Sequence, residues 1–139
     1  MESRVQLALN VSDIDQAVEF YEKFFRTTAT KRQPGYANFA IAEPPLKLVL
    51  IENPGASVRL NHLGVEVFEQ AQVAEAQQRL TGLQLPVVSE ENVSCCYAVQ
   101  DKVWVTDPDG APWETYVVLD SADTMGESRS ECCAAGGCN

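Results

Sequence analysis

The chain has 139 residues, 45% of them hydrophobic, which is enough to bury one core and matches the usual size of a single domain. It carries 20 acidic and 10 basic residues and a formal net charge of −10. Such a surface repels nucleic-acid phosphates and anionic membranes, so neither is an expected partner. The sequence has neither the basic start and apolar run of a secretory signal nor an apolar stretch of membrane-spanning length, so the expected location is the cytoplasm.

The five cysteines fall into two groups. Cys95 and Cys96 are adjacent within the predicted domain, and three more lie in the last eight residues, namely Cys132, Cys133 and Cys138. In a reducing cytoplasm all five are expected to be thiols. Their pattern therefore favours metal, metalloid or redox chemistry over a structural disulfide framework.

The first half of the chain predicts a strand, a helix and three further strands. Val5–Val11 alternates weakly between apolar and polar residues, and Ser12 is the expected cap of a helix from Asp13 to about Phe25. Turn residues then separate three expected strands, at Thr27–Lys31, Tyr36–Ile41 and Leu46–Ile51.

The second half repeats this order. Leu60–Phe68 predicts a strand and Gln70–Leu80 a helix, and three strands follow, at Pro86–Ser89, Val103–Thr106 and Trp113–Leu119. We therefore expect an α+β fold of two tandem βαβββ modules, at about 4–54 and 59–120, within one domain at 1–120. Residues 121–139 are small and polar and predict a flexible tail that carries cysteines.

Aligning the two halves places Gln6 opposite His62 and Lys47 opposite Glu114. The first pair of marked positions, Gln6 and Lys47, is separated by 41 residues, and the second pair, His62 and Glu114, by 52. The second module is thus longer by 11 residues, and the cysteine pair lies in the stretch that absorbs this difference. Local elaboration of a repeated scaffold is a common place for specificity.

Two sets of residues suggest binding chemistry. Cys95 and Cys96 offer soft sulfur ligands, whereas Gln6, His62 and Glu114 offer harder nitrogen and oxygen atoms that suit a divalent transition metal. Taken singly, each of these residues is more often structural than functional, and adjacent cysteines are often small buried hydrophobes. Neighbours on a regular strand point to opposite faces, so chelation by both sulfurs requires a bent segment, and the polar stretch at 90–94 is the expected loop.

The order of elements and two motifs resemble the vicinal oxygen chelate superfamily of glyoxalases, bleomycin-resistance proteins and extradiol dioxygenases. The motifs are Phe20-Tyr21-Glu22-Lys23-Phe24-Phe25 at the end of the first helix and Asp107-Pro108-Asp109-Gly110 before a strand that carries Glu114. The resemblance covers Val5 to about Leu119. It implies a curved mixed sheet around a metal cleft, on a scaffold that hosts many reactions.

Within that superfamily, the sequence closely resembles the carbon–arsenic lyases that demethylate trivalent organoarsenicals, with cadmium-induced proteins as near relatives. This resemblance is carried by Asn61-His62-Leu63-Gly64-Val65-Glu66-Val67, by the Cys95-Cys96 pair and by the stretch from Tyr97 to Gly110. It implies cleavage of the C–As bond of methylarsenite or trivalent aromatic arsenicals to arsenite, with Fe(II) as cofactor and dioxygen as co-substrate.

The same resemblance assigns the site residues. It implies that Gln6, His62 and Glu114 are the metal ligands and form the catalytic centre, and that Cys95 and Cys96 hold the arsenic of the substrate. At the fourth ligand position of glyoxalase-type sites the chain has a lysine, whose ammonium has no lone pair for a cation. Three protein ligands leave metal positions open for substrate and dioxygen.

Several alternatives stay open at this stage. A non-catalytic protein that binds cadmium or arsenite through its thiols is the main competing function, whereas antibiotic resistance does not explain adjacent thiols. The chain is expected to be a monomer or a homodimer, and no acid or base residue is assigned. The tail cysteines either capture metalloid or are incidental. Four residues either line or gate the cleft or only build the hairpin, namely Tyr97, Val99, Asp101 and Lys102.

Overall fold

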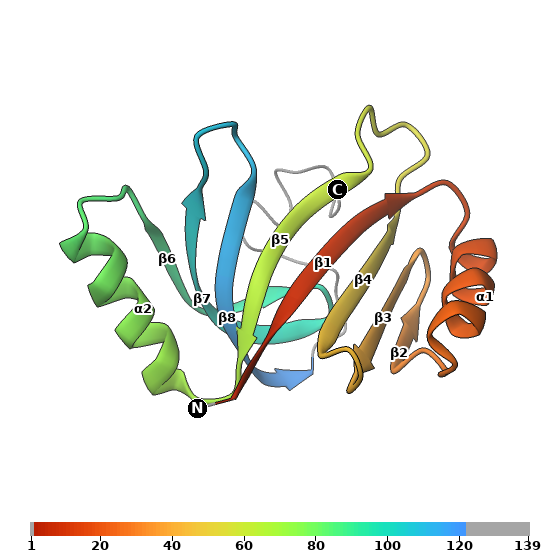
Figure 1. Ribbon diagram of the computed structural model, residues 1–139, viewed down its shortest axis with the longest axis horizontal. Helices are drawn as coiled ribbons and strands as arrows, with labels where there is room; N and C mark the ends of the chain where they lie inside the picture. Colours follow the sequence, from red (N-terminus) through yellow and green to blue (C-terminus); the bar gives the residue numbers. More distant parts are fainter. Residues whose placement is uncertain (1, 122–139) are drawn as a thin grey trace.

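Eight strands form one mixed sheet in the order β2-β3-β4-β1-β5-β8-β7-β6 in the computed structural model, which describes residues 2–121. Figure 1 shows that this sheet is strongly curved. The strands are β1 Ser3–Val11, β2 Lys31–Gln33, β3 Tyr36–Ile41, β4 Leu46–Glu52, β5 Leu60–Val67, β6 Val88–Cys95, β7 Ala98–Thr106 and β8 Pro112–Ser121. The predicted α+β fold with two βαβββ modules in a curved mixed sheet is confirmed.

The two modules join through their first strands. β1 pairs with β4 in parallel within the first module, β5 pairs with β8 in parallel within the second, and β1 pairs with β5 antiparallel between them. The four central strands therefore come from both halves of the chain. Side chains that point to the same face of these strands converge, although they are far apart in sequence.

The helices are α1 Ile14–Phe25 and α2 Gln70–Gly82, which lie toward opposite ends of the sheet (Figure 1). Helix α1 packs on β3 and β4, and α2 packs on β5, β7 and β8. The predicted cap Ser12 is wrong by one residue, because the side chain of Asp13 accepts the hydrogen bond from the Gln16 amide. The apolar stripe of α1, including Ile14 and Val18, is buried against Phe39, Leu48 and Leu50.

Several predicted strand boundaries differ from the structure, and the strand expected at Val103–Thr106 begins at Ala98. The strand expected at Thr27–Lys31 begins only at Lys31, because the backbone amides of Thr27 and Ala29 donate to the backbone and carboxylate of Glu22 and cap the end of α1. The loop expected at 90–94 is part of strand β6, with a bulge between Glu90 and Val93. β6 is an edge strand, so its polar residues face solvent and hide the usual strand pattern.

Strand β8 continues through Ser121, one residue beyond the predicted end of the domain. The rest of the predicted tail, with Cys132, Cys133 and Cys138, lies outside the described residues. Within residues 2–121, neither helix is long and apolar enough to cross a membrane.

Candidate metal and thiol site

Three polar side chains meet on three adjacent strands at the centre of the sheet. Gln6 on β1, His62 on β5 and Glu114 on β8 are 4%, 1% and 3% exposed. Gln6 Nε2 lies 3.1 Å from His62 Nε2 and 2.7 Å from Glu114 Oε2, and His62 Nε2 lies 2.7 Å from Glu114 Oε2. The three residues that the resemblance assigned to a metal are therefore brought together in a buried cluster.

Gly64 makes room for this cluster. Gly64 is the cross-strand partner of Gln6 on β1 and of Glu114 on β8. A side chain at position 64 would lie on the same face of β5 as His62, two residues earlier. A Cβ atom at Gly64 would lie 2.9 Å from Glu114 Cγ and 3.0 Å from Gln6 Nε2. The missing side chain leaves the space in which the three polar groups meet.

The spacing of the three donor groups fits a divalent cation. Metal bonds of about 2.1 Å at right angles place neighbouring ligand atoms about 3.0 Å apart, close to the separations observed here. Gln6 would ligate through its carbonyl oxygen, which changes places with Nε2 when the amide rotates by half a turn. No group of three or more His, Cys, Asp and Glu residues suits a metal within 2–121, so the amide of Gln6 is essential to this candidate site.

Glu114 is held in its charged form. Burial by itself raises the pKa of Glu114, but the Lys102 ammonium and His62 outweigh it through their charges and hydrogen bonds, so the pKa lies well below the usual range. Lys102 Nζ donates to Glu114 Oε1 at 2.7 Å and is itself 1% exposed. Lys102 thus occupies Oε1 of Glu114, whereas Oε2 faces Gln6 and His62 and is available to a cation.

A chain of side-chain amides fixes the imidazole of His62. His62 Nδ1 lies 2.8 Å from Asn61 Oδ1, which only accepts hydrogen bonds, so Nδ1 carries a proton and Nε2 is the nitrogen that faces Gln6 and Glu114. Asn61 Nδ2 donates to Asn10 Oδ1, and Asn10 Nδ2 donates to the Val58 carbonyl. A histidine that binds a metal through Nε2 commonly has such a partner on its other nitrogen.

Replacing Asn61 with Leu is expected to weaken metal binding by about 10- to 100-fold, because the imidazole loses the partner that sets its orientation. Asn61→Asp keeps an oxygen acceptor for His62 Nδ1 and is expected to lose less affinity. The measurement is titration of each variant with Fe(II) under anaerobic conditions. Equal affinity in Asn61→Leu and the unchanged protein would show that Asn61 does not orient the ligand.

Lys47 does not join the cluster of Gln6, His62 and Glu114. It pairs with Gln6 across β1 and β4, and its ammonium lies 3.3 Å from the carboxylate of Glu66, which also binds Arg4. Glu114 pairs with Gly64 rather than with His62, so the alignment of the two modules is offset by two residues in the sheet. A shift of two residues keeps both positions on the same face.

The cysteine pair sits at the tip of the β6–β7 hairpin. Cys95 pairs with Ala98, so Cys96 and Tyr97 form a two-residue turn, and their φ angles of 53° and 60° are those of a type I′ turn. This sharp turn places the sulfurs of Cys95 and Cys96 only 3.7 Å apart. Two bonds of about 2.3 Å, the length of a zinc–thiolate bond, span up to about 4.6 Å, so one atom can bridge both sulfurs.

Contacts with the first module hold this turn in place. Non-glycine residues in the left-handed region cost about 1–2 kcal/mol each, so the turn needs support from its surroundings. The Tyr97 ring lies 5.2 Å from the Tyr36 ring, and Lys31 Nζ donates to the Tyr97 carbonyl at 2.6 Å. The β6–β7 hairpin of the second module therefore packs against strands β2 and β3 of the first module.

The expectation that every cysteine is a thiol is not met at Cys95, which is disulfide-bonded. Its separation from Cys96 Sγ is far longer than an S–S bond of about 2.05 Å, so these neighbours are not bonded to each other. Cys95 is fully buried and packs on Trp104, whose ring lies 5.4 Å from the His62 ring. Chelation by both sulfurs requires that this disulfide be reduced first.

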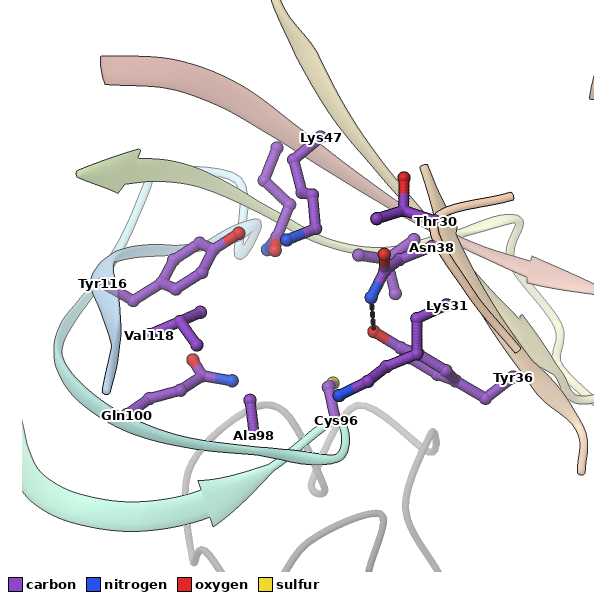
Figure 2. Close-up of a pocket in the computed structure, with 12 residues that line it drawn as sticks. Thr30, Lys31, Tyr36, Asn38, Lys47, Cys96, Ala98, Gln100, Tyr116 and Val118 are labelled. Atoms are coloured by element: carbon purple, nitrogen blue, oxygen red, sulfur yellow. Dashed lines mark hydrogen bonds between the residues drawn. The ribbon is translucent and has the colours of Figure 1, made fainter. Parts of the chain in front are cut away.

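One residue from each set lines a cavity of about 220 Å³. Gln6 and Cys96 both line it, and Figure 2 shows Cys96 beside Lys31 at one wall and Tyr116 with Gln100 at another. Burial, followed by the charges of Glu66 and Glu114, raises the pKa of Tyr116 well above its usual value, so the phenol stays protonated. A small molecule in this cavity would share it with the Cys96 side chain and with Gln6, one of the three candidate metal ligands.

Sequence reasoning missed several residues of this site. Lys102 was expected to line or gate the cleft or to build the hairpin, whereas it pairs with Glu114. Glycine in the middle of a strand was a usable signal for Gly64, since it marks close approach of neighbouring groups. Tyr116, two residues beyond Glu114, and Gln100 share the cavity, and strand alternation alone was the available signal for Tyr116.

Comparison with known proteins agrees with this fold. A relative from Thermomonospora curvata named trivalent organoarsenical cleaving enzyme is 58% identical over 132 residues, which cover 94% of this chain and 87% of that protein. Cadmium-induced protein CadI of Mycobacterium tuberculosis is 56% identical over 124 residues, 89% of this chain and 82% of that protein. Homoprotocatechuate 2,3-dioxygenase from Arthrobacter globiformis has a TM-score of 0.61 at 20% identity, over 86% of this chain and 37% of that one. The model of the Glyoxalase/Bleomycin resistance protein/Dioxygenase superfamily matches residues 4–115, and the chain therefore belongs to that superfamily.

Proposed function

We propose that this protein is a carbon–arsenic lyase that uses Fe(II) and dioxygen to cleave the C–As bond of trivalent organoarsenicals and release arsenite. The observation that carries the proposal is that Cys96 and Gln6 line the same cavity, so a substrate bound through sulfur would occupy the cavity that Gln6 also lines. The name of the relative from Thermomonospora curvata, trivalent organoarsenical cleaving enzyme, supports the same substrate class.

Each part of the site has a distinct task in this proposal. Gln6, His62 and Glu114 would hold Fe(II), which supplies the activation of dioxygen when bound. Cys95 and Cys96 bind arsenic as thiolates and direct its organic group into the cavity. Tethering at arsenic holds the carbon in place, so the reaction at the C–As bond needs no further binding step. For methylarsenite, the reaction of one substrate molecule with one dioxygen molecule gives arsenite and formaldehyde, and all atoms are accounted for.

Loss of either sulfur is expected to abolish turnover. Cys95→Ser and Cys96→Ser should each lower the rate of arsenite formation at least about 100-fold, because arsenic is no longer held in place by two sulfurs. The measurement is arsenic speciation after reduced protein has been loaded with Fe(II) without oxygen and then mixed with methylarsenite and air. Unchanged rates in both serine variants would remove the proposed role of the pair.

Gln6→Ala tests the candidate metal centre and is the counterpart of the cysteine variants. It removes one expected ligand and leaves both sulfurs in place, so it should lose arsenite formation and still bind methylarsenite stoichiometrically in the absence of metal. Cys96→Ser should lose both properties, whereas Cys95→Ser should lose arsenite formation and bind methylarsenite through one sulfur only. This split separates failure of the metal centre from failure of the thiol pair.

The alternative function is a non-catalytic protein that binds cadmium or arsenite, and the name of the relative CadI favours it. It requires only the thiols. In that case the protein would bind metalloid tightly without turnover, and Glu114→Ala would leave binding unchanged. Conversion of more than one methylarsenite per protein molecule would exclude this alternative.

A further inference from the structure

Two buried polar atoms in the cavity lack a hydrogen-bond partner within residues 2–121. These are the hydroxyl of Tyr116 and Oε1 of Gln100, and the two residues are 2% and 4% exposed. They are the only buried side-chain nitrogen or oxygen atoms in this state among the residues that the structure describes. Buried polar groups are nearly always paired in folded proteins, so these two await a ligand or a water molecule.

The two groups are complementary. A phenol is protonated at neutral pH and donates a hydrogen bond, whereas an amide oxygen only accepts one. Both side chains line the cavity, and Figure 2 shows them on the same wall, with Val118 between them. A hydroxyl group has the right chemistry for both, because it can accept from Tyr116 and donate to Gln100.

The two sulfurs differ in access to this cavity. Cys96 lines it, whereas Cys95 is fully buried behind the turn, packs on Trp104 and is not part of the cavity wall. A molecule that enters the cavity therefore meets Cys96 first. Gln100 also contacts Cys95, because its Nε2 donates to the Cys95 carbonyl at 2.7 Å.

We propose that arsenic is captured in two ordered steps, and that Tyr116 and Gln100 hold the hydroxyl group that arsenic retains after it has bound Cys96 alone. This inference rests on the proposed function. A trivalent organoarsenical in water carries one organic group and two hydroxyls. In the first step a Cys96 sulfur–arsenic bond forms, one arsenic–oxygen bond breaks, and the thiol proton leaves with the hydroxide as water.

In the second step the thiol of Cys95 repeats this exchange. Its sulfur replaces the remaining hydroxyl, a second water leaves, and arsenic stays trivalent throughout. Tyr116 donates to the oxygen of that hydroxyl and so stabilises it as it departs, while Gln100 fixes both the hydroxyl and the backbone of Cys95. Tyr116 and Gln100 therefore stabilise only the adduct in which arsenic is bound to one sulfur, since the adduct with two sulfurs has no hydroxyl left.

The test uses reduced, metal-free protein without oxygen and methylarsenite as the probe. Native mass spectrometry should show that the unchanged protein loses two waters on binding, whereas Cys95→Ser loses one and retains the hydroxyl. In the Cys95→Ser background, Tyr116→Phe should weaken methylarsenite binding about three- to tenfold, the worth of one hydrogen bond. With Cys95 present, Tyr116→Phe should change the affinity less than about twofold.

Tyr21→Phe in the Cys95→Ser background is the matched control, because Tyr21 lies on α1 and packs in the core of the first module. It should leave methylarsenite affinity unchanged. Equal losses from Tyr116→Phe with and without Cys95 would indicate a merely structural role and would overturn the proposal, as would no loss in the Cys95→Ser background. Failure of the unchanged protein to form an adduct with two sulfurs would instead count against the proposed function.

Discussion

Lys102→Met is expected to lower the free energy of unfolding of the metal-free protein by about 3–5 kcal/mol, because it leaves a buried carboxylate without its cation. Lys102 and Glu114 are almost completely buried and joined by a hydrogen bond of 2.7 Å. The measurement is chemical denaturation at pH 7. Lys23→Met is the matched control, since Lys23 pairs with Glu19 at the surface and should contribute less than about 0.5 kcal/mol.

Divalent metal should restore part of this loss. A cation bound by Gln6, His62 and Glu114 supplies positive charge next to the same carboxylate, and any ligand that binds only the folded state stabilises it. Fe(II) should therefore raise the stability of Lys102→Met more than that of the unchanged protein. A second change, Glu114→Gln, should also recover stability in Lys102→Met, because it removes the unpaired charge. If neither recovers stability, the loss comes from packing rather than from charge.

The pH dependence has a definite sign. The folded-state pKa of Glu114 is lowered, so its stabilising contribution is present above the carboxyl pKa of the unfolded chain, about 4.3, and is lost as pH falls toward the folded value. Without the Lys102 charge the pKa of Glu114 rises. The difference in stability between Lys102→Met and the unchanged protein should therefore shrink as pH falls below about 4.

Gly64→Ala is expected to destabilise the fold by about 1–3 kcal/mol and to weaken Fe(II) binding at least about tenfold. The added Cβ would meet the side chain and the backbone oxygen of Glu114, both at 2.9 Å, and Gln6 Nε2 at 3.0 Å. Relief of these contacts requires Gln6 and Glu114 to move apart, and this movement separates the atoms that would bind the metal. Both effects are measured by denaturation and anaerobic metal titration.

Gly55→Ala is the matched control for this change. A Cβ atom at Gly55 would meet nothing within 4 Å, so the variant should keep its stability and its metal affinity. Normal Fe(II) affinity in Gly64→Ala would mean that the metal is not bound by Gln6 and Glu114 as inferred.

The tertiary structure also changes the interpretation of the cysteine pair. From the sequence, chelation by neighbours on one strand requires a bend, which was expected before the pair, at 90–94. The bend instead follows Cys95, where Cys96 and Tyr97 both adopt positive φ. A turn formed by Cys and Tyr lacks the Asn and Gly that usually mark a type I′ turn, so local composition gave no sign of it.

The sequence by itself determined the order of the elements, the division into two modules and the residues that meet at the centre. Apolar periodicity and turn residues are local properties, and a resemblance carried by motifs identified Gln6, His62 and Glu114 without coordinates. Only the tertiary structure decided how these groups are supported. The Lys102–Glu114 pair, the amide of Asn61 on His62, the space above Gly64 and the unpaired Tyr116 hydroxyl depend on contacts between strands that are distant in sequence. Such contacts follow from register and burial, which local pattern does not specify.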